Sequence, residues 1–336
     1  MKGIAILAML CHHLYGCPPD GVDPYTGVLL WLGILGKVCV VMFLFCSGYG
    51  LAANFAPKSF KDDLKFIGRR LVKFYLNYWV IFIIFVPITI FFFYRPLSAA
   101  YGENNVCWHL VLDILAFQGL ESYNITWWFN NTIIILYLLF PLLYRAIRWK
   151  PLVALLVGMV IMRIAYHLPY NPADVLTWQF PFILGIIWRM YEGKGACVQD
   201  WFSAHRGGSV LGVLGLLAII IVFRMWEIIP HFSGARMDGF LSCAIALCVI
   251  VILRSCKYLM ATFAFFGKHS MNIYMVHTFI NGYWYSKWLH SDEWIRGGAN
   301  FAVLLSICVV ISIVVEFFKE KAGIYQLIRR INNKIQ

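Results

Sequence analysis

Long apolar segments, separated by short polar ones, recur along the whole chain. Most of them run for about 17–25 residues, the length that an α-helix needs to cross a hydrocarbon core of ~30 Å. Transmembrane β-strands would instead alternate over segments of ~10 residues. The pattern therefore predicts an all-α polytopic membrane protein with about ten transmembrane helices. We place these spans near 2–16, 28–52, 71–93, 127–147, 151–168, 174–191, 208–229, 238–256, 265–287 and 298–318.

One apolar segment, residues 106–120, does not fit this series because it is too short to span a membrane. It contains His109 and Asp113, which are four positions apart and therefore share one face of a helix. Counting it as a span would also move the basic residues near 145–150 to the outer side. We predict a re-entrant or interfacial segment whose two polar residues contact neighbouring helices. A catalytic role for this pair is the alternative.

Composition and charge agree with a membrane protein. Of 336 residues, 61% are hydrophobic and 13% are charged, whereas soluble domains have ~25% charged residues. The net charge of +12 does not indicate nucleic-acid binding, because most of the Lys and Arg residues fall on one side of the predicted helices. By the positive-inside rule, both termini are cytoplasmic. We predict one transmembrane domain, 1–320, followed by a short basic cytoplasmic tail, 321–336.

The first predicted helix carries ionisable groups inside an apolar segment. His13 lies eleven positions after Lys2, roughly 16 Å along a helix and so about half-way through the hydrocarbon core. Ionisable residues at that depth are costly and are candidates for function. The adjacent His12 points about 100° away from His13, and we predict a packing role for it. Because this span is about five residues short, we expect residues upstream of Met1 to extend it.

Other charged and aromatic residues are candidates in later spans. Lys37 lies within the second span and has either a buried partner or a substrate anion as its contact. The glycines that flank Tyr49 are expected to let another helix approach closely. Trp127 and Trp128 are expected at the outer interface, in an aromatic belt.

A basic segment precedes the third span and includes Arg69, Arg70 and Lys73. Arg70 and Lys73 share one helical face. They are either topogenic charges that contact anionic lipid headgroups or a clamp for the phosphates of a cytoplasmic nucleotide cofactor. His277 lies in the ninth span at a depth similar to that of His13. Its imidazole either orients His13 or an acceptor, or makes a structural hydrogen bond.

Five short segments in this order resemble acyltransferase family 3, a family of integral-membrane acyltransferases that modify bacterial surface glycans and related lipids or antibiotics. The resemblance extends from Lys2 to His277, and the family has about ten membrane helices. The segments are Lys2–Leu7 with His12-His13, Phe43–Tyr49, Arg69–Lys73, Trp127–Phe129 with Tyr137–Pro141, and Phe266–Met271 with Val276-His277.

The resemblance implies roles for individual residues. Lys2 and His13 stand where the family has an arginine and, after ten further residues, a histidine. The family's cytoplasmic Arg-x-x-Arg corresponds to Arg70-Leu-Val-Lys73. His13 is then the base that deprotonates the acceptor hydroxyl or, alternatively, a transiently acylated nucleophile. His277 joins it as a candidate catalytic residue.

The donor that the resemblance implies is cytoplasmic acetyl-CoA or another acyl-CoA, and no metal is expected. The residues assigned to binding the donor are Lys2, Lys37, Arg69, Arg70 and Lys73. Trp128 and Tyr49 are assigned to the acceptor, which is a carbohydrate or a lipid-linked glycan. Membrane lipid is the other expected partner.

The predicted function is therefore an O-acetyltransferase of the bacterial cytoplasmic (inner) membrane that acts on a surface polysaccharide. Family members often carry a soluble SGNH-type esterase domain after the membrane part, and this chain resembles the stand-alone form. The alternative is a multipass transporter or flippase for a lipid-linked glycan, in which the buried His and Lys residues would line a substrate path.

Overall fold

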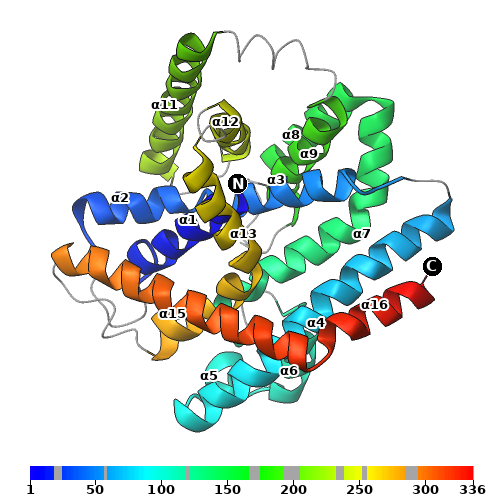
Figure 1. Ribbon diagram of the computed structural model, residues 1–336, viewed down its shortest axis with the longest axis vertical. Helices are drawn as coiled ribbons and strands as arrows, with labels where there is room; N and C mark the ends of the chain where they lie inside the picture. Colours follow the sequence, from blue (N-terminus) through cyan, green and yellow to red (C-terminus); the bar gives the residue numbers. More distant parts are fainter. Residues whose placement is uncertain are drawn as a thin grey trace. The chain divides into compact units, whose positions relative to one another are not determined.

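The computed structural model describes residues 1–18, 25–56, 59–118, 122–165, 175–192, 205–231, 238–251, 256–284 and 294–335. Within these ranges every regular element is helical (Figure 1). The elements are α1 (Lys2–Tyr15), α2 (Gly27–Gly36), α3 (Cys39–Ala52), α4 (Phe60–Phe92), α5 (Ser98–Tyr101), α6 (Val106–Ile114), η2 (Ile125–Trp127), α7 (Trp128–Trp149), α8 (Pro151–Ala165), α9 (Val175–Tyr191), α11 (Arg206–His231), α12 (Asp238–Val251), α13 (Lys257–Thr278), η5 (Phe279–Trp284), α15 (Trp294–Lys321) and α16 (Ile324–Lys334).

The prediction of an all-helical membrane protein is confirmed. Four helical segments are long and apolar enough to cross a membrane, namely Gly27–Ala52, Phe60–Phe92, Ile125–Trp149 and Gly297–Lys321. Shorter apolar helices cover Pro151–Ala165, Gly207–Val222 and Asp238–Val251. The count of ten spans and the cytoplasmic position of both termini stay predictions.

Apolar side chains are also exposed in the way that lipid-facing helices require. On a soluble protein, an apolar patch larger than a few hundred Å² would be unusual. The largest exposed apolar side chains on α8 and α15 are Leu152, Val153, Leu156, Val157, Val160, Ile164, Val310, Ile313, Val314, Phe317 and Phe318.

Helix α4 begins eleven residues earlier than the predicted span at 71–93. Ser59 caps its N-terminus, because the Ser59 hydroxyl accepts a hydrogen bond from the backbone N–H of Asp62 at 3.2 Å. Asp62 and Asp63 in the first turn also favour a helix start. The 33 residues of α4 make it roughly 50 Å long, so about 20 Å of it extends beyond a ~30 Å hydrocarbon core.

The predicted span 28–52 is interrupted at Lys37, between α2 and α3. Two glycines bring α2 into backbone contact with α1. A Cβ at Gly33 would lie 2.7 Å from the carbonyl carbon of Tyr15, and one at Gly36 would lie 2.9 Å from the backbone nitrogen of His12. Only glycine allows such an approach.

The chain folds into two compact units. The first contains residues 1–5, 38–56 and 138–267, and α3 packs along α9 within it (Figure 1). A Cβ at Gly48 would overlap the carbonyl oxygen of Phe182, and one at Gly185 would overlap that of Phe45. The expected close approach of another helix is thus confirmed at Gly48. The prediction was wrong for Gly50, where a Cβ would meet nothing within 4 Å.

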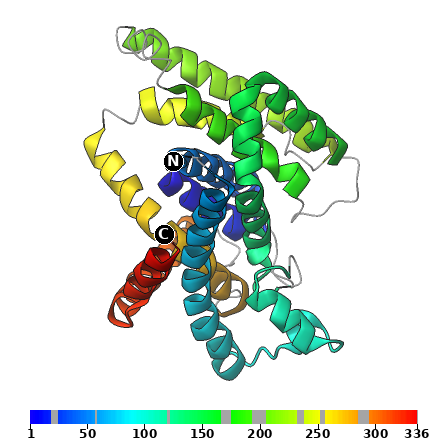
Figure 2. The ribbon, with the colours of Figure 1, turned by 90° about the vertical axis from the view of Figure 1, so that its right-hand side faces the viewer.

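The second unit contains residues 6–37, 57–137 and 268–336. One group of its buried aromatic side chains comes from α4, η2, η5 and the segment before η2, namely Tyr78, Tyr123, Trp127 and Phe279. The residues predicted as a basic tail form α16, which packs against α4 (Figure 2). Ile328 of α16 is buried, whereas Arg329 and Arg330 are exposed.

Candidate functional site

Two histidines from distant parts of the sequence meet in the second unit. His13 lies near the C-terminal end of α1, and His277 is the penultimate residue of α13. His13 Nδ1 lies 3.0 Å from His277 Nε2, and the two ring centroids are 4.7 Å apart. His277 is fully buried and His13 is half-buried. Of the two rings, His13 therefore has the better access to another molecule.

The neighbouring carbonyl groups determine which ring nitrogens carry hydrogen. His277 Nδ1 lies 2.7 Å from the carbonyl oxygen of Tyr274 and must donate to it, so in the neutral ring His277 Nε2 is an acceptor. His13 Nδ1 faces that acceptor and, at 3.1 Å, the carbonyl oxygen of Met9. Both are acceptors, and His13 Nδ1 must therefore be the donor. His13 Nε2 is left with its lone pair, the form that a general base requires.

A chain of polar side chains continues behind His277. Thr278 Oγ1 lies 3.2 Å from His277 Nε2 and 3.1 Å from Thr126 Oγ1. Thr126 donates to Asn124 Oδ1 at 2.8 Å, and Asn124 Nδ2 donates to the carbonyl oxygen of Met275 at 3.3 Å. These contacts attach η2 to the end of α13, where the helix changes to the π-helical η5. The His277 ring therefore contacts the Tyr274 carbonyl oxygen at Nδ1 and Thr278 Oγ1 at Nε2.

Asp113 forms hydrogen bonds that fix the segment before η2. Its carboxylate accepts hydrogen bonds from Tyr101 Oη at 2.7 Å, from the backbone N–H of Tyr123 at 2.6 Å and from Tyr78 Oη at 3.2 Å. It is 1% exposed. Burial raises the pKa of Asp113 to about 6, although these hydrogen bonds favour the carboxylate and oppose the shift. The expected contact of α6 with neighbouring elements is confirmed for Asp113.

His109, on the same short helix, contacts Gln118 instead. Its Nδ1 lies 2.6 Å from Gln118 Nε2, and its ring stacks on that of Tyr101. Tyr101 therefore contacts both residues, Asp113 through its hydroxyl group and His109 through its ring. The arrangement gives α6 a structural role beside η2.

The predicted donor-binding residues Arg69, Arg70 and Lys73 lie on the N-terminal part of α4. Arg69 Nε donates to the carbonyl oxygen of Lys65 at 3.3 Å, and the Arg70 guanidinium lies 5.2 Å from the centre of the Phe66 ring. Across the described ranges, no carboxylate forms an ion pair with any of the three. A cluster of cations in this arrangement is suited to binding phosphate.

The other predicted binding residues have separate environments. Lys2 is the first residue of α1 and Lys37 is the C-cap of α2. Tyr49 donates to Glu192 Oε1 at 3.1 Å, and its ring centre lies 6.0 Å from the Arg189 guanidinium. The roles of Lys2, Lys37 and Tyr49 stay predictions.

Trp128, a predicted acceptor contact, is the half-buried first residue of α7. The neighbouring Trp127 was expected in an aromatic belt, and this was wrong. Trp127 is 2% exposed, and its Nε1 donates to the carbonyl oxygen of Met275 at 3.2 Å. Its indole N–H finds a partner in the interior, so the side chain packs inside the protein.

His12 has its own hydrogen-bond partners outside the histidine pair, although its ring centre lies 5.1 Å from that of His13. Its Nδ1 donates to the carbonyl oxygen of Gly33 at 2.8 Å, and its Nε2 lies 3.6 Å from Cys17 Sγ. A packing role therefore fits His12. In the described part of the chain, no group of three or more His, Cys, Asp or Glu side chains could hold a metal ion.

Sequence reasoning missed the polar partners Thr278, Thr126 and Asn124, and the buried Lys319. Threonine and asparagine are common in helix termini and turns, so they gave no signal by themselves. Lys319 lies among basic residues at the end of the last predicted span, where one more cation fits the positive-inside pattern. Its burial was the missing information.

Comparison with known proteins shows to which family this protein belongs. The family model of acyltransferase family 3, described as an acyltransferase domain, matches residues 1–317. No curated protein and no solved structure gives a significant match. Because the model covers nearly the whole chain, from α1 into α15, this protein belongs to acyltransferase family 3.

Proposed function

We propose that this protein is an O-acetyltransferase of a bacterial cytoplasmic membrane. It moves an acetyl group from cytoplasmic acetyl-CoA to a hydroxyl of a surface polysaccharide, its lipid-linked precursor or another glycan. The family and the apolar helices support acyl transfer in a membrane. The observation that carries the proposal is the 3.0 Å contact between His13 Nδ1 and His277 Nε2. With the hydrogen on His13 Nδ1, as the neighbouring carbonyl groups require, His13 Nε2 is unprotonated.

The histidine pair can perform the proton transfers of this reaction. His13 Nε2 takes the proton of the acceptor hydroxyl while the hydroxyl oxygen attacks the thioester carbonyl carbon. The C–O bond forms, the C–S bond breaks, and the proton on His13 passes to the departing CoA thiolate. His277 Nε2 accepts the hydrogen bond of His13 Nδ1 throughout and stabilises the transient imidazolium. His277 is itself fixed by the carbonyl group of Tyr274.

The basic part of α4 is suited to the donor. CoA carries several phosphate oxygens, and paired Arg and Lys side chains bind such groups through charge-assisted hydrogen bonds. Arg70 and Lys73 lie three residues apart on α4 and have no carboxylate partner within the described ranges. We therefore assign the phosphates to Arg69, Arg70 and Lys73.

Trp128 is the residue that we assign to the acceptor. It follows Trp127, whose indole contacts the backbone of α13 two residues before His277. Trp128 is half-buried, so part of the residue is exposed. An aromatic face suits a sugar ring, because the C–H groups of the sugar can pack against it.

The experiment that tests this function is acetyl transfer by the purified protein. The protein in detergent or proteoliposomes is incubated with radiolabelled acetyl-CoA and a surface-glycan extract, and both labelled glycan and free CoA thiol are measured. We expect transfer by the wild type and none above background by His13→Ala. His12→Ala is the matched control, because it removes the adjacent imidazole and should retain transfer.

Two outcomes would contradict the proposal. If the folded wild type transfers no acyl group with any acyl-CoA and glycan fraction offered, the proposed function is wrong. If His13→Ala keeps full activity, His13 is not the base. Mass spectrometry of protein quenched after donor addition separates the two forms of catalysis. An acetyl group on His13 would identify a covalent intermediate instead of direct attack.

A further inference from the structure

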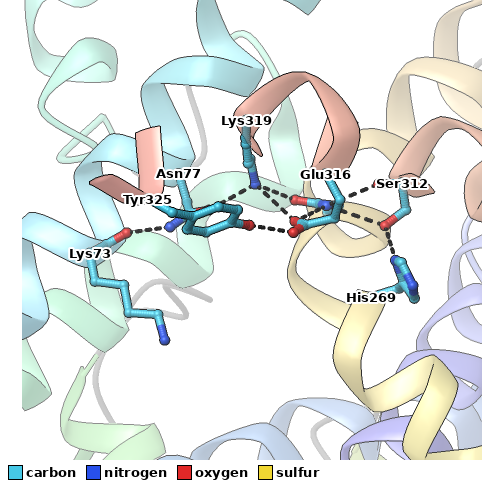
Figure 3. Close-up of polar contacts among 8 residues, drawn as sticks. Lys73, Asn77, His269, Ser312, Glu316, Lys319 and Tyr325 are labelled. Carbon is cyan, nitrogen blue, oxygen red and sulfur yellow. Dashed lines mark hydrogen bonds and ion pairs between the residues drawn. The ribbon is translucent and has the colours of Figure 1, made fainter. Parts of the chain in front are cut away.

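Lys319 is buried near the C-terminal end of α15 and is 1% exposed. Its ammonium group donates to Asn272 Oδ1 at 2.7 Å, to Asn77 Oδ1 at 2.8 Å and to Glu316 Oε1 at 3.4 Å (Figure 3). An ammonium group has three N–H donors and no acceptor. Each donor of Lys319 therefore has an oxygen partner, and both asparagines present their carbonyl oxygens to it.

The partners of Lys319 are themselves hydrogen-bonded. Glu316 accepts from Asn272 Nδ2 at 2.7 Å and from the Tyr325 hydroxyl. Asn272 Nδ2 also lies 3.2 Å from Ser312 Oγ, which contacts His269 Nδ1 at 2.9 Å. The network joins α4, α13, α15 and α16, all through residues of the second unit (Figure 3).

A gain in stability is a weak explanation for this network. A buried ion pair often stabilises a fold no better than well-packed apolar residues of the same volume, because desolvation of the charges offsets their attraction. Polar and charged residues within membrane helices are also costly. Lys319 joins α4, through Asn77, to α13, through Asn272. What these two helices carry suggests a role for the Lys319 charge.

One of these helices carries the proposed donor cations. Asn77 is one turn beyond Lys73 on α4, and its Nδ2 donates to the Lys73 carbonyl oxygen at 2.7 Å. The Lys73 side chain points away from the network and does not join it (Figure 3). Lys319 thus fixes the backbone of α4 next to the cations and leaves the Lys73 ammonium group available to a ligand.

The other helix carries His277. Asn272 lies five residues before His277 on α13, roughly 7.5 Å along the helix. A single ammonium group therefore holds two amide oxygens, one on the helix of the donor cations and one on the helix that carries His277. Their separation is determined by the two N–H···O hydrogen bonds of Lys319.

We propose that Lys319 is a positioning residue for acyl transfer. By holding Asn77 and Asn272 at a constant separation, it sets the distance from the phosphate-binding cations of α4 to the His13–His277 pair. This inference rests on the proposed function. A thioester whose phosphates are bound at one place has a pantetheine arm of limited reach, and a misplacement of ~1 Å at the reacting atoms can reduce the rate ~10²-fold.

The test removes the charges without leaving one of them unpaired. Lys319→Met combined with Glu316→Gln keeps similar volumes and removes both charges, whereas Lys319→Met alone leaves the Glu316 carboxylate without its cation. We expect the double variant to fold and to bind CoA within two-fold of the wild-type Kd, measured by calorimetry. We expect its kcat for acetyl transfer to fall ten-fold or more.

The control is Lys321→Met. Lys321 lies two residues further along α15, and its ammonium group lies 5.6 Å from the centre of the Phe317 ring, outside the network. This variant loses a cation from the same end of the helix. We expect it to retain the wild-type kcat.

A second variant tests the α4 connection by itself. Asn77→Ala leaves Lys319 with Asn272 and Glu316 as partners, so folding should be retained even if the double variant fails to fold. We expect a lower kcat with an unchanged Kd for CoA. Adding Asn272→Ala should reduce kcat by less than the product of the two single effects, because both asparagines act through one ammonium group.

The results that overturn the inference are distinct from those that overturn the function. If the wild type transfers acetyl and the folded Lys319 and Asn77 variants keep its kcat, the network is only structural. If their Kd for CoA rises and kcat does not change, Lys319 acts on donor binding and the positioning role is wrong. If the folded wild type transfers no acyl group, the proposed function and this inference fail together.

Discussion

His277 Nε2 lies 3.0 Å from His13 Nδ1, although 264 positions separate the two residues in the sequence. The hydrogen bond between the two rings has a defined direction. His13 donates through Nδ1 and keeps the lone pair of Nε2, while His277 accepts from His13 and donates to the Tyr274 carbonyl oxygen. On the proposed function, His13 is therefore the base, and His277 orients it.

Removal of His277 should reduce turnover more than donor binding. In His277→Ala the His13 Nδ1–H keeps only the Met9 carbonyl oxygen as an acceptor and the ring loses the contact that orients it. We therefore expect kcat to fall by ~10²-fold or more, with the KM for acetyl-CoA within about two-fold of the wild type. His277→Gln should recover part of the rate, because its amide oxygen can accept the Nδ1–H bond. Steady-state kinetics of the three proteins measure this. Equal kcat values in all three would show that His277 does not orient the base.

Loss of the phosphate-binding cations should have the opposite kinetic effect. Arg70→Ala combined with Lys73→Ala removes two charge-assisted contacts of ~1.5–3 kcal/mol each, which predicts a KM for acetyl-CoA at least ten-fold higher. The control is Arg329→Ala combined with Arg330→Ala, which removes the same number of exposed cations from α16. An unchanged KM in the first variant would show that Arg70 and Lys73 do not bind the donor and act only as topogenic charges.

The two glycines around Tyr49 should respond differently to the same substitution. A Cβ at Gly48 would overlap the carbonyl oxygen of Phe182, and we expect Gly48→Ala to destabilise the protein by about 1–3 kcal/mol, as overpacking does. A Cβ at Gly50 meets nothing within 4 Å, so Gly50→Ala should be neutral or stabilise α3 by up to ~1 kcal/mol. Thermal unfolding in detergent compares them. Equal midpoints would contradict the close α3–α9 contact.

Asp113 should make stability depend on pH between about 4 and 6. Burial raises the pKa of Asp113 to about 6 in the folded protein, and in the unfolded chain it is ~3.9. The folded state therefore binds the proton more tightly, and the contribution of Asp113 is favourable below about pH 4 and is lost as the pH rises through 6. We expect a loss of about 2–3 kcal/mol over this interval relative to Asp113→Asn.

The measurement is the unfolding midpoint of both proteins across that pH range. The amide that replaces the carboxyl group in Asp113→Asn cannot ionise, so the curve of this variant reports every other titrating group. The difference between the two curves isolates the carboxylate. A constant difference from pH 4 to pH 7 would contradict the raised pKa.

The sequence by itself determined the helical membrane class and the candidate base. Apolar length is a local property, and it located a helix at every predicted span that falls within the described residues. An imidazole in an apolar segment identified His13, because an ionisable group is costly there. Local caps were underestimated. The Ser59 cap extended α4 well before the predicted start of its span.

Only the tertiary structure decided which polar residues act together. The sequence left two equal interpretations of His277, and it contained no sign that His277 Nε2 lies 3.0 Å from His13 Nδ1. Lys319 was indistinguishable from its exposed neighbours, because burial of a helix face depends on the helices that cover it. Asn77, Asn272 and Lys319 come from three separate helices. Their meeting depends on how the helices pack, which apolar periodicity within one segment does not encode.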